Sequence, residues 1–318
     1  MNGGGVREDD PVTGVFEGFA TIIAVIALGA FLAHIRVLDL PAQVLLSRLA
    51  FFVASPALLV TVLADTDVTA VFSRNLAASF VGVAVAGLLY VASARFVLHR
   101  GAAETVIGAL CAAYVNAGNL GLPIASYVLG DVALVAPVLL MQLLVLQPLA
   151  LAVLDHTTST GPFSIGRLLS RPLRTPLTVG SLIGLALSLT GLELPPAVHD
   201  PLALVGGMAV PAMLLAYGIS LRLGPRPGHG SGAAELTWLA VLKLVVQPAA
   251  ACLTGLLLGL DDAALLAVTV LSALPTAQNI FVHATRYDRG VVLARDTIFV
   301  TTVLAVPAIL VITKVLAG

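Results

Sequence analysis

Runs of mostly apolar residues follow one another along almost the whole chain, separated by short polar connections. A helix needs roughly 20 apolar residues to cross a bilayer, and most of these runs reach that length. They cover approximately 14–34, 42–63, 76–98, 104–129, 132–154, 177–190, 202–221, 236–258, 263–284 and 291–316. Because backbone in hydrocarbon must satisfy its own hydrogen bonds, the pattern predicts an all-α integral membrane protein with ten transmembrane helices.

The composition supports a location in a bilayer. Apolar residues make up 59% of the chain and charged residues only 10%, whereas soluble domains have about 45–50% and about 25%. The mean hydropathy is +1.05. Residues 1–13 are acidic rather than basic, so they do not resemble a secretory signal. Cys111 and Cys252 lie in apolar runs without CxxC spacing, which predicts buried free thiols and neither a disulfide nor a metal site.

Basic residues are distributed unevenly between the two sides that the ten runs define. Connections after odd-numbered runs contain Arg36, Arg95, Arg100, Arg167, Arg171, Arg174, Arg222, Arg226, Arg286 and Arg289. The opposite side has only Arg7, Arg74 and Lys314, and Arg48, Lys243 and Arg295 lie inside runs. The positive-inside rule therefore places the odd connections in the cytoplasm and both termini outside. The net charge of -1 gives no indication of nucleic-acid binding.

Two halves of the chain resemble each other at an offset of about 155 residues. The segment 38–41 resembles 192–195, and 56–59 resembles 211–214. Five runs per half would give the second half the opposite orientation in the membrane. We therefore expect a first five-helix repeat over 1–154, a cytoplasmic linker and candidate hinge over 155–176, and an inverted second repeat over 177–318.

The fourth and ninth runs are interrupted by residues that break helices. The fourth contains Asn116, Gly118, Asn119, Gly121 and Pro123, and the ninth contains Pro275, Thr276, Gln278 and Asn279. Irregular backbone at membrane depth is tolerated only where it faces protein or a watery cavity. Interruptions at corresponding places of two halves are typical of secondary transporters, so we predict that these residues bind the solute. The alternative is a pair of proline kinks, with the glycines serving close helix packing.

The residue types at the interruptions favour an anionic solute. A half-helix that begins after an interruption has unpaired N–H groups and a partial positive charge at its start. Amides and a hydroxyl add further partners, so a carboxylate is the simplest solute. Lys243 and His283 are accessory candidates. Lys243 either snorkels or ties down a helix end, or else attracts the anion near the cytoplasmic mouth; His283 is either a hydrogen-bonded helix residue or a proton shuttle.

Acidic residues are missing from both interruptions, which argues against a buried sodium or proton site. The nearest acids are Glu104, Asp288 and Asp296. Asp296 beside Arg295 reads as a local ion pair or interfacial anchor, and the alternative is a proton-linked role. Carbonyls freed at the interruptions could still coordinate sodium, so coupling stays open. No nucleophile–base pair or pair of acids lies at the interruptions, so we expect neither an enzyme nor a cofactor. A purely structural membrane protein remains the other alternative.

These motifs resemble the auxin efflux carrier family, which includes plant PIN-type carriers and bacterial malate and malonate carriers. The resemblance rests on residues 51–58, 116–123, 211–221 and 274–287 and covers nearly the whole chain. It implies a scaffold of spans 1, 2, 6 and 7, a transport unit of spans 3–5 and 8–10 whose fourth and ninth helices cross at midplane, and elevator-like movement. Val115 and Thr276 stand where plant members have proline and often glutamine, and the long central loop is absent, so a compact prokaryotic member is expected.

Together these observations predict a carrier of small organic anions such as carboxylates in the cytoplasmic membrane. Export or potential-driven uniport is the expected mode, because a negative-inside potential expels anions. The alternative is a sodium- or proton-coupled organic acid symporter that resembles the bile acid transporters. Beyond solute and lipid, the weakly polar first and second spans are compatible with a homodimer through the scaffold.

Overall fold

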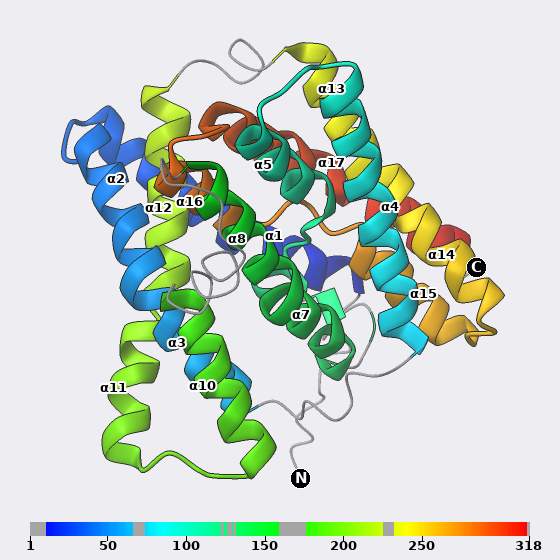
Figure 1. Cartoon of the computed structure of the whole chain (residues 1–318), viewed down its shortest axis with the longest axis horizontal. Coiled ribbons are helices and arrows are strands. Elements are labelled where there is room, and N and C mark those ends of the chain that lie inside the picture. Colours follow the sequence, from blue (N-terminus) through cyan, green and yellow to red (C-terminus); the bar gives the residue numbers. More distant parts are fainter. Residues whose placement is uncertain are drawn as a thin grey trace, which may run out of the picture.

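The computed structural model describes residues 11–65, 74–121, 124–125, 129, 132–158, 176–224 and 232–316, which are almost entirely helical. The first half contains α1 (Pro11–His34), α2 (Leu40–Leu49), η1 (Ala50–Ala54), α3 (Ser55–Ala64), α4 (Arg74–Phe96), α5 (Ala102–Ala113), η3 (Ala117–Gly121), η5 (Val132–Val135), α7 (Ala136–Met141), η6 (Gln142–Leu146) and α8 (Gln147–Thr158) (Figure 1). The second contains α10 (Pro176–Thr190), α11 (Pro196–Gly206), α12 (Ala209–Leu223), α13 (Ala233–Val241), η8 (Leu242–Val246), α14 (Gln247–Leu257), α15 (Asp262–Ser272), α16 (Asn279–Tyr287) and α17 (Val291–Leu316). Residues 1–10 and most of the predicted linker, 159–175, lie outside the described residues.

Within the described residues, six helical segments are long and apolar enough to cross a membrane: Leu40–Ala64, Arg74–Phe96, Pro137–Thr157, Pro196–Leu223, Ala233–Leu257 and Val291–Leu316. Four shorter apolar helices cover Ala20–His34, Ala102–Ala113, Val179–Thr190 and Asp262–Ser272. The protein is therefore an all-helical membrane protein, as the apolar runs predict. Each of the ten predicted runs overlaps one of these segments, but the short ones leave the number of complete spans a prediction.

Three of the long helices contain a π-helical turn directly before a proline. The turns η1, η6 and η8 are each followed by one residue and then by Pro56, Pro148 or Pro248. Proline has no N–H to donate and its ring collides with the carbonyl four residues earlier. A wider turn at this place lets the helix continue past the proline.

The helices form two groups, each held together by close packing of its own helices. In the first group, α1 packs on α12, α3 packs on α10 and α11, and α2 packs on α12. In the second, α4 packs on α5 and α14, and α15 packs on α14 and α17. Figure 1 shows α2, α3 and α10–α12 on one side of the molecule and α4 and α13–α15 on the other.

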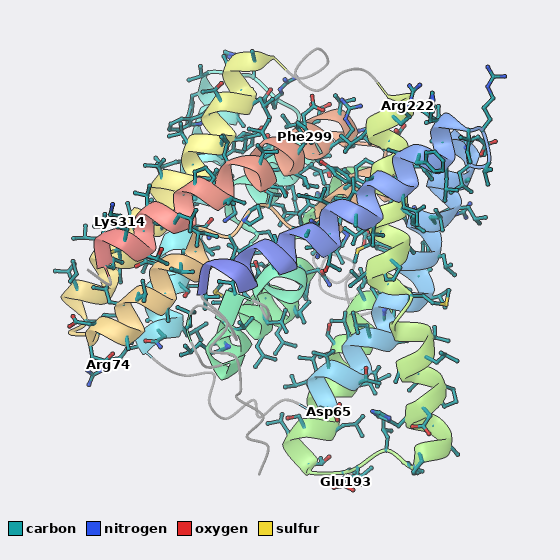
Figure 2. The ribbon with its side chains drawn as sticks, turned by 180° about the vertical axis from the view of Figure 1, so that it is seen from behind. Asp65, Arg74, Glu193, Arg222, Phe299 and Lys314 are labelled. Atoms are coloured by element: carbon teal, nitrogen blue, oxygen red, sulfur yellow. The ribbon has the colours of Figure 1, made fainter. Side chains whose placement is uncertain are left out.

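Charged side chains mark the ends of the first group. Arg222, near the end of α12, lies at the opposite end of this group from Asp65 and Glu193 (Figure 2). Arg74 begins α4 and Lys314 lies in the last turn of α17.

Both predicted interruptions are present, and the structure brings them into contact. Helix α5 ends at Ala113, and α15 ends at Ser272 before α16 begins at Asn279. Between these ends, Val115 and Thr276 form an isolated antiparallel β-bridge. The N–H of Asn116 donates to the carbonyl of Pro275 (2.9 Å), and that of Ala277 donates to the carbonyl of Tyr114 (3.2 Å). Each interruption thus satisfies part of the backbone that the other leaves unpaired.

Candidate solute cavity

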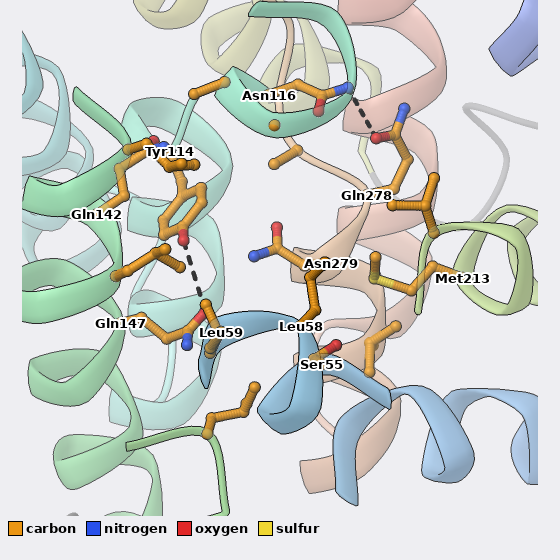
Figure 3. Close-up of a pocket in the computed structure, with 18 of the residues that line it drawn as sticks. Ser55, Leu58, Leu59, Tyr114, Asn116, Gln142, Gln147, Met213, Gln278 and Asn279 are labelled. Atoms are coloured by element: carbon orange, nitrogen blue, oxygen red, sulfur yellow. Dashed lines mark hydrogen bonds between the residues drawn. The ribbon is translucent and has the colours of Figure 1, made fainter. Parts of the chain in front are cut away.

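A cavity of about 280 Å³ opens where the two interruptions meet (Figure 3). Its polar lining comes from Ser55, Tyr114, Asn116, Gln142, Gln147, Gln278, Asn279 and His283. Apolar side chains from η1, α3 and α12, such as Phe51, Leu59 and Met213, cover the opposite wall. Among the described residues, no Asp, Glu, Lys or Arg lines this cavity. The site can therefore recognise a solute by hydrogen bonds and helix ends, without a fixed opposite charge.

An amide pair joins the two interruptions at the cavity wall. The Asn116 Nδ2 donates to the Gln278 Oε1 at 2.8 Å (Figure 3). Asn116 is only 2% exposed, and its carbonyl accepts from Leu120 and Gly121 at the start of the next helical turn. Gly118 lines the cavity as well, and a Cβ there would meet nothing within 4 Å. Both amides thus lie on backbone that hydrogen bonds between the two interruptions hold in place.

Two glutamines of the fifth predicted span support the first interruption. The Gln142 Oε1 accepts the Val115 N–H at 2.6 Å, and the Gln147 Oε1 accepts from the Tyr114 hydroxyl at 3.5 Å. Both glutamines also line the cavity. The sequence offers them only as polar residues within an apolar run. Tyr217, a polar residue of the seventh run, does not line the cavity and donates its hydroxyl to the carbonyl of Arg295.

Helix α16 presents polar atoms to the cavity. It begins at Asn279, whose side chain projects into the space between Tyr114 and Met213 (Figure 3). The Asn279 Oδ1 and both ring nitrogens of His283 are buried without a hydrogen-bond partner. Buried polar atoms are normally paired, so a bound solute or water is the expected partner of these atoms.

Several residues predicted to bind the solute lie elsewhere. Thr276 is fully buried; its hydroxyl donates to the carbonyl of Cys111 (2.6 Å) and its N–H to the Thr301 hydroxyl (3.2 Å). Gly121 packs against Leu274, and neither it, Thr276 nor Pro275 lines the cavity. These three residues hold the second interruption in place instead. Pro123 and the side chain of Asn119 lie outside the described residues.

Lys243 connects the ends of the two interrupted helices. It is fully buried, and its Nζ donates to the Gln247 Oε1 (2.7 Å) and to the carbonyl of Ser272 (3.2 Å). The Gln247 Nε2 in turn donates to the carbonyl of Ala113 (3.1 Å). Ser272 and Ala113 are the last residues of α15 and α5, where helix dipoles place partial negative charge. The structure thus supports the helix-end role of Lys243 and leaves it outside the cavity lining.

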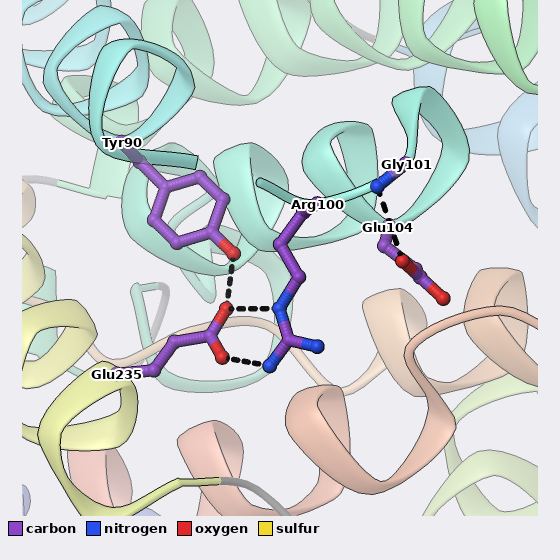
Figure 4. A network of polar contacts seen from close by, with 5 residues as sticks. All are labelled: Tyr90, Arg100, Gly101, Glu104 and Glu235. Atoms are coloured by element: carbon purple, nitrogen blue, oxygen red, sulfur yellow. Dashed lines mark hydrogen bonds and ion pairs between the residues drawn. The ribbon is translucent and has the colours of Figure 1, made fainter. Parts of the chain in front are cut away.

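Other buried charges are paired away from the cavity. The predicted Arg295–Asp296 ion pair is confirmed, with the Arg295 Nε and Nη2 at 2.8 and 2.5 Å from the Asp296 Oδ1. Glu235, which the sequence reasoning missed, accepts from the Tyr90 hydroxyl (2.7 Å) and from the guanidinium of Arg100 (Figure 4). This cluster ties α4, the start of α5 and α13 together. In the described part of the chain, no group of three or more His, Cys, Asp or Glu could hold a metal ion, and Cys111 and Cys252 are free.

Comparisons with known proteins identify the family of this chain. The model of a family described as membrane transport protein matches residues 14–155 and 163–313. A protein of Rhizobium meliloti (strain 1021) named "Putative malonate transporter" is 26% identical over 283 residues, which cover 86% of this chain and 88% of that protein. Because the family match covers most of the chain, the protein belongs to the membrane transport protein family, which is that of the auxin efflux carriers.

Proposed function

We propose that this membrane transport protein is a carrier of small organic anions, carboxylates in particular, in the cytoplasmic membrane. One observation carries the proposal: the two interruptions meet at a cavity lined by amides and by the start of α16, with no acidic side chain among its described lining. Amide N–H groups and a helix start both favour a carboxylate.

The size and chemistry of the cavity fit a small solute. Its volume of about 280 Å³ is at the lower end of ligand pockets, which run from about 300 to 1,000 Å³. The name of the Rhizobium relative refers to malonate, a small dicarboxylate. Hydrogen bonds from Asn116, Gln278 and Asn279 to carboxylate oxygens would be charge-assisted, and such bonds contribute about 1.5–3 kcal/mol each.

The packing of the helices supports an elevator arrangement. We infer that α1–α3 and α10–α12 form the scaffold, and that α4–α8 and α13–α17 form the transport unit. On this view the chain consists of two inverted five-helix repeats, 1–154 and 177–318, joined by the cytoplasmic linker 155–176. The ten helices include a fourth and a ninth that cross at midplane, and both termini lie outside. The cavity wall combines Phe51, Leu59 and Met213 of the scaffold with Asn116 and Gln278 of the transport unit, as expected for a solute carried along this interface.

Lys243 supports uncoupled, potential-driven export over sodium coupling. Its Nζ donates to the carbonyl of Ser272 at the end of α15 and, through Gln247, is linked to the carbonyl of Ala113 at the end of α5, where freed carbonyls would otherwise suit a sodium ion. A lysine donor held at this position occupies the place that a coupling cation would take. The alternative is a sodium- or proton-coupled symporter. For protons, the observation in its favour is His283, whose two ring nitrogens face the cavity region unpaired.

The test combines binding and transport in purified protein. Thermal stability would be measured with malonate, acetate, indole-acetate, neutral amino acids and cations, with and without sodium, and uptake of labelled malonate would be followed in proteoliposomes. We expect a carboxylate-specific rise in melting temperature. Asn116→Ala should reduce affinity at the cavity by about tenfold or more, because it removes one charge-assisted partner.

Asn75→Ala is the matched control, since Asn75 lies in the first turn of α4, away from the cavity lining. It should bind and transport like the wild type. Stabilisation by neutral solutes or cations alone, or an Asn116→Ala protein that transports like the wild type, would contradict the proposal.

A further inference from the structure

A second pocket, of about 270 Å³, lies between α2, η1 and α16, next to the cavity. Its lining includes Ser47, Arg48, Phe52, Val282, Thr285 and Arg286. This arginine pocket differs from the cavity in kind, because its described lining has two guanidinium groups and no acid. Nothing in the sequence connects Arg48 with Arg286, which are far apart in the chain and meet only through the packing of α16 on α2.

Both arginines lack an acidic partner within the described part of the chain. The ion pairs of that part involve Arg100, His199 and Arg295, and neither Arg48 nor Arg286. The Arg286 Cζ lies 4.9 Å from the centroid of the Phe52 ring, a cation–π contact that leaves the guanidinium edges available.

Hydroxyl groups complete the polar lining. The Thr285 Oγ1 is buried without a hydrogen-bond partner. The buried Ser47 hydroxyl accepts from the Gln43 Nε2 at 3.3 Å, so its own proton remains available for a ligand. Two guanidinium forks and two hydroxyl donors match the oxygens of a carboxylate.

The arginine pocket adjoins the cavity along α16 and η1. On α16, Val282 lines both spaces, and Arg286 follows it by about one turn. On η1, Phe51 lines the cavity and Phe52 lines the pocket. The rings of Phe51 and His283 meet edge to face, with their centroids 5.7 Å apart, on the cavity side of this boundary.

We propose that the arginine pocket is a second anion-binding site, where a carboxylate arriving from the cytoplasm docks before it passes Phe51 and His283 into the cavity. Arg286 belongs to a connection that the positive-inside rule assigns to the cytoplasm, and Arg48 lies near the start of its span on the same side. The site itself follows from the geometry; the identity of its carboxylate rests on the proposed function. A lipid phosphate has similar oxygens, so the test separates soluble anion from lipid.

Binding at the arginine pocket can be isolated in an Asn116→Ala background, where the cavity is weakened. In detergent without added lipid, malonate should still raise the melting temperature of this protein, and adding Arg48→Gln or Arg286→Gln should abolish that rise. In proteoliposomes, either arginine variant alone should raise the KM for efflux by about tenfold, corresponding to one lost charge-assisted contact. Arg286→Lys should restore part of the affinity, because it keeps the charge but not the fork.

Arg289→Gln is the control, since the exposed Arg289 donates only to the carbonyl of its neighbour Asp288 among the described contacts. The inference is overturned if the residual malonate response survives both glutamine variants. It is also overturned if only phosphatidylglycerol, and no soluble carboxylate, stabilises the protein through these arginines. If the wild type transports no carboxylate while the arginine-dependent malonate response persists, the proposed function fails and the anion site stands. If transport depends on Asn116 but not on the arginines, the proposed function stands and the second anion site fails.

Discussion

Single residues at the interruptions act mainly by completing each other's hydrogen bonds. Asn116 and Gln278 pair across the two interruptions, and Gln142 receives the N–H of Val115. Lys243 has the same role at the helix ends, where its Nζ donates to the carbonyl of Ser272. Removing one partner from a buried pair costs more than the pair contributes, because the remaining group is left desolvated.

Lys243→Ala should therefore lower stability and create a cation site. The substitution leaves the Gln247 Oε1 and the carbonyl of Ser272 without their donor, at a cost of about 1–3 kcal/mol for each unsatisfied group. Sodium or methylammonium should then raise the melting temperature of the variant by binding in the vacated space, while the wild type should not respond.

Lys314→Ala provides the comparison, because Lys314 is exposed in the last turn of α17. It should change neither the melting temperature nor the response to cations. A wild-type protein that sodium stabilises as strongly as Lys243→Ala would show that Lys243 does not replace a coupling ion.

At the scale of helices, glycines let neighbouring backbones touch. Gly218 on α12 faces α1 so closely that a Cβ there would lie 2.1 Å from the carbonyl oxygen of Ile26. Gly29 makes the reciprocal approach from α1, where a Cβ would lie 2.5 Å from the carbonyl oxygen of Leu215. Small residues at such contacts are the common basis of helix association in membranes.

Gly218→Ala should destabilise the protein by at least the 1–3 kcal/mol typical of overpacking, because the obstacle is backbone and cannot rotate away. Gly87→Ala in α4 is the matched control, since its Cβ would meet only the Ala113 methyl at an ordinary 3.6 Å. Thermal unfolding in one detergent measures both. Equal melting temperatures for the two variants would mean that α1 and α12 can separate without loss.

Elements and interruptions could be predicted because each has a local signal. Apolar runs indicate helices in a bilayer, and glycine, proline and amide residues around Asn116 and Pro275 indicate where those helices stop. Contacts between residues that are far apart in the sequence have no such local signal. The register that pairs Val115 with Thr276, the contact of Lys243 with Ser272, and the burial of Thr276 away from the cavity depend on how distant helices pack. Glu235 was missed for a related reason: it lies at the start of an apolar run, where an acid normally reaches water.

On the scale of the whole molecule, the distribution of charge bears on the driving force. The described cavity lining contains no ionised side chain of Asp, Glu, Lys or Arg, and Lys243 is retained by hydrogen bonds to protein groups. A carboxylate would therefore cross the membrane as the moving charge. A membrane potential acts on such a charge at about 2.3 kcal/mol per 100 mV, and a negative interior drives it outward.

Proteoliposomes loaded with malonate and potassium, and treated with valinomycin in low-potassium buffer, acquire a negative interior. Efflux should then accelerate, and reversing the potential should drive uptake. For each net negative charge, 100 mV should support a concentration ratio of about 50-fold at equilibrium. Replacing sodium by choline should leave these fluxes intact, because no sodium ion travels with the solute. Asn116→Ala should weaken the potential-driven flux together with the binding at the cavity. Transport that needs a sodium gradient and does not respond to the valinomycin potential would instead support the coupled symporter. It would contradict both the uniport mechanism and the proposal that Lys243 takes the place of a coupling cation.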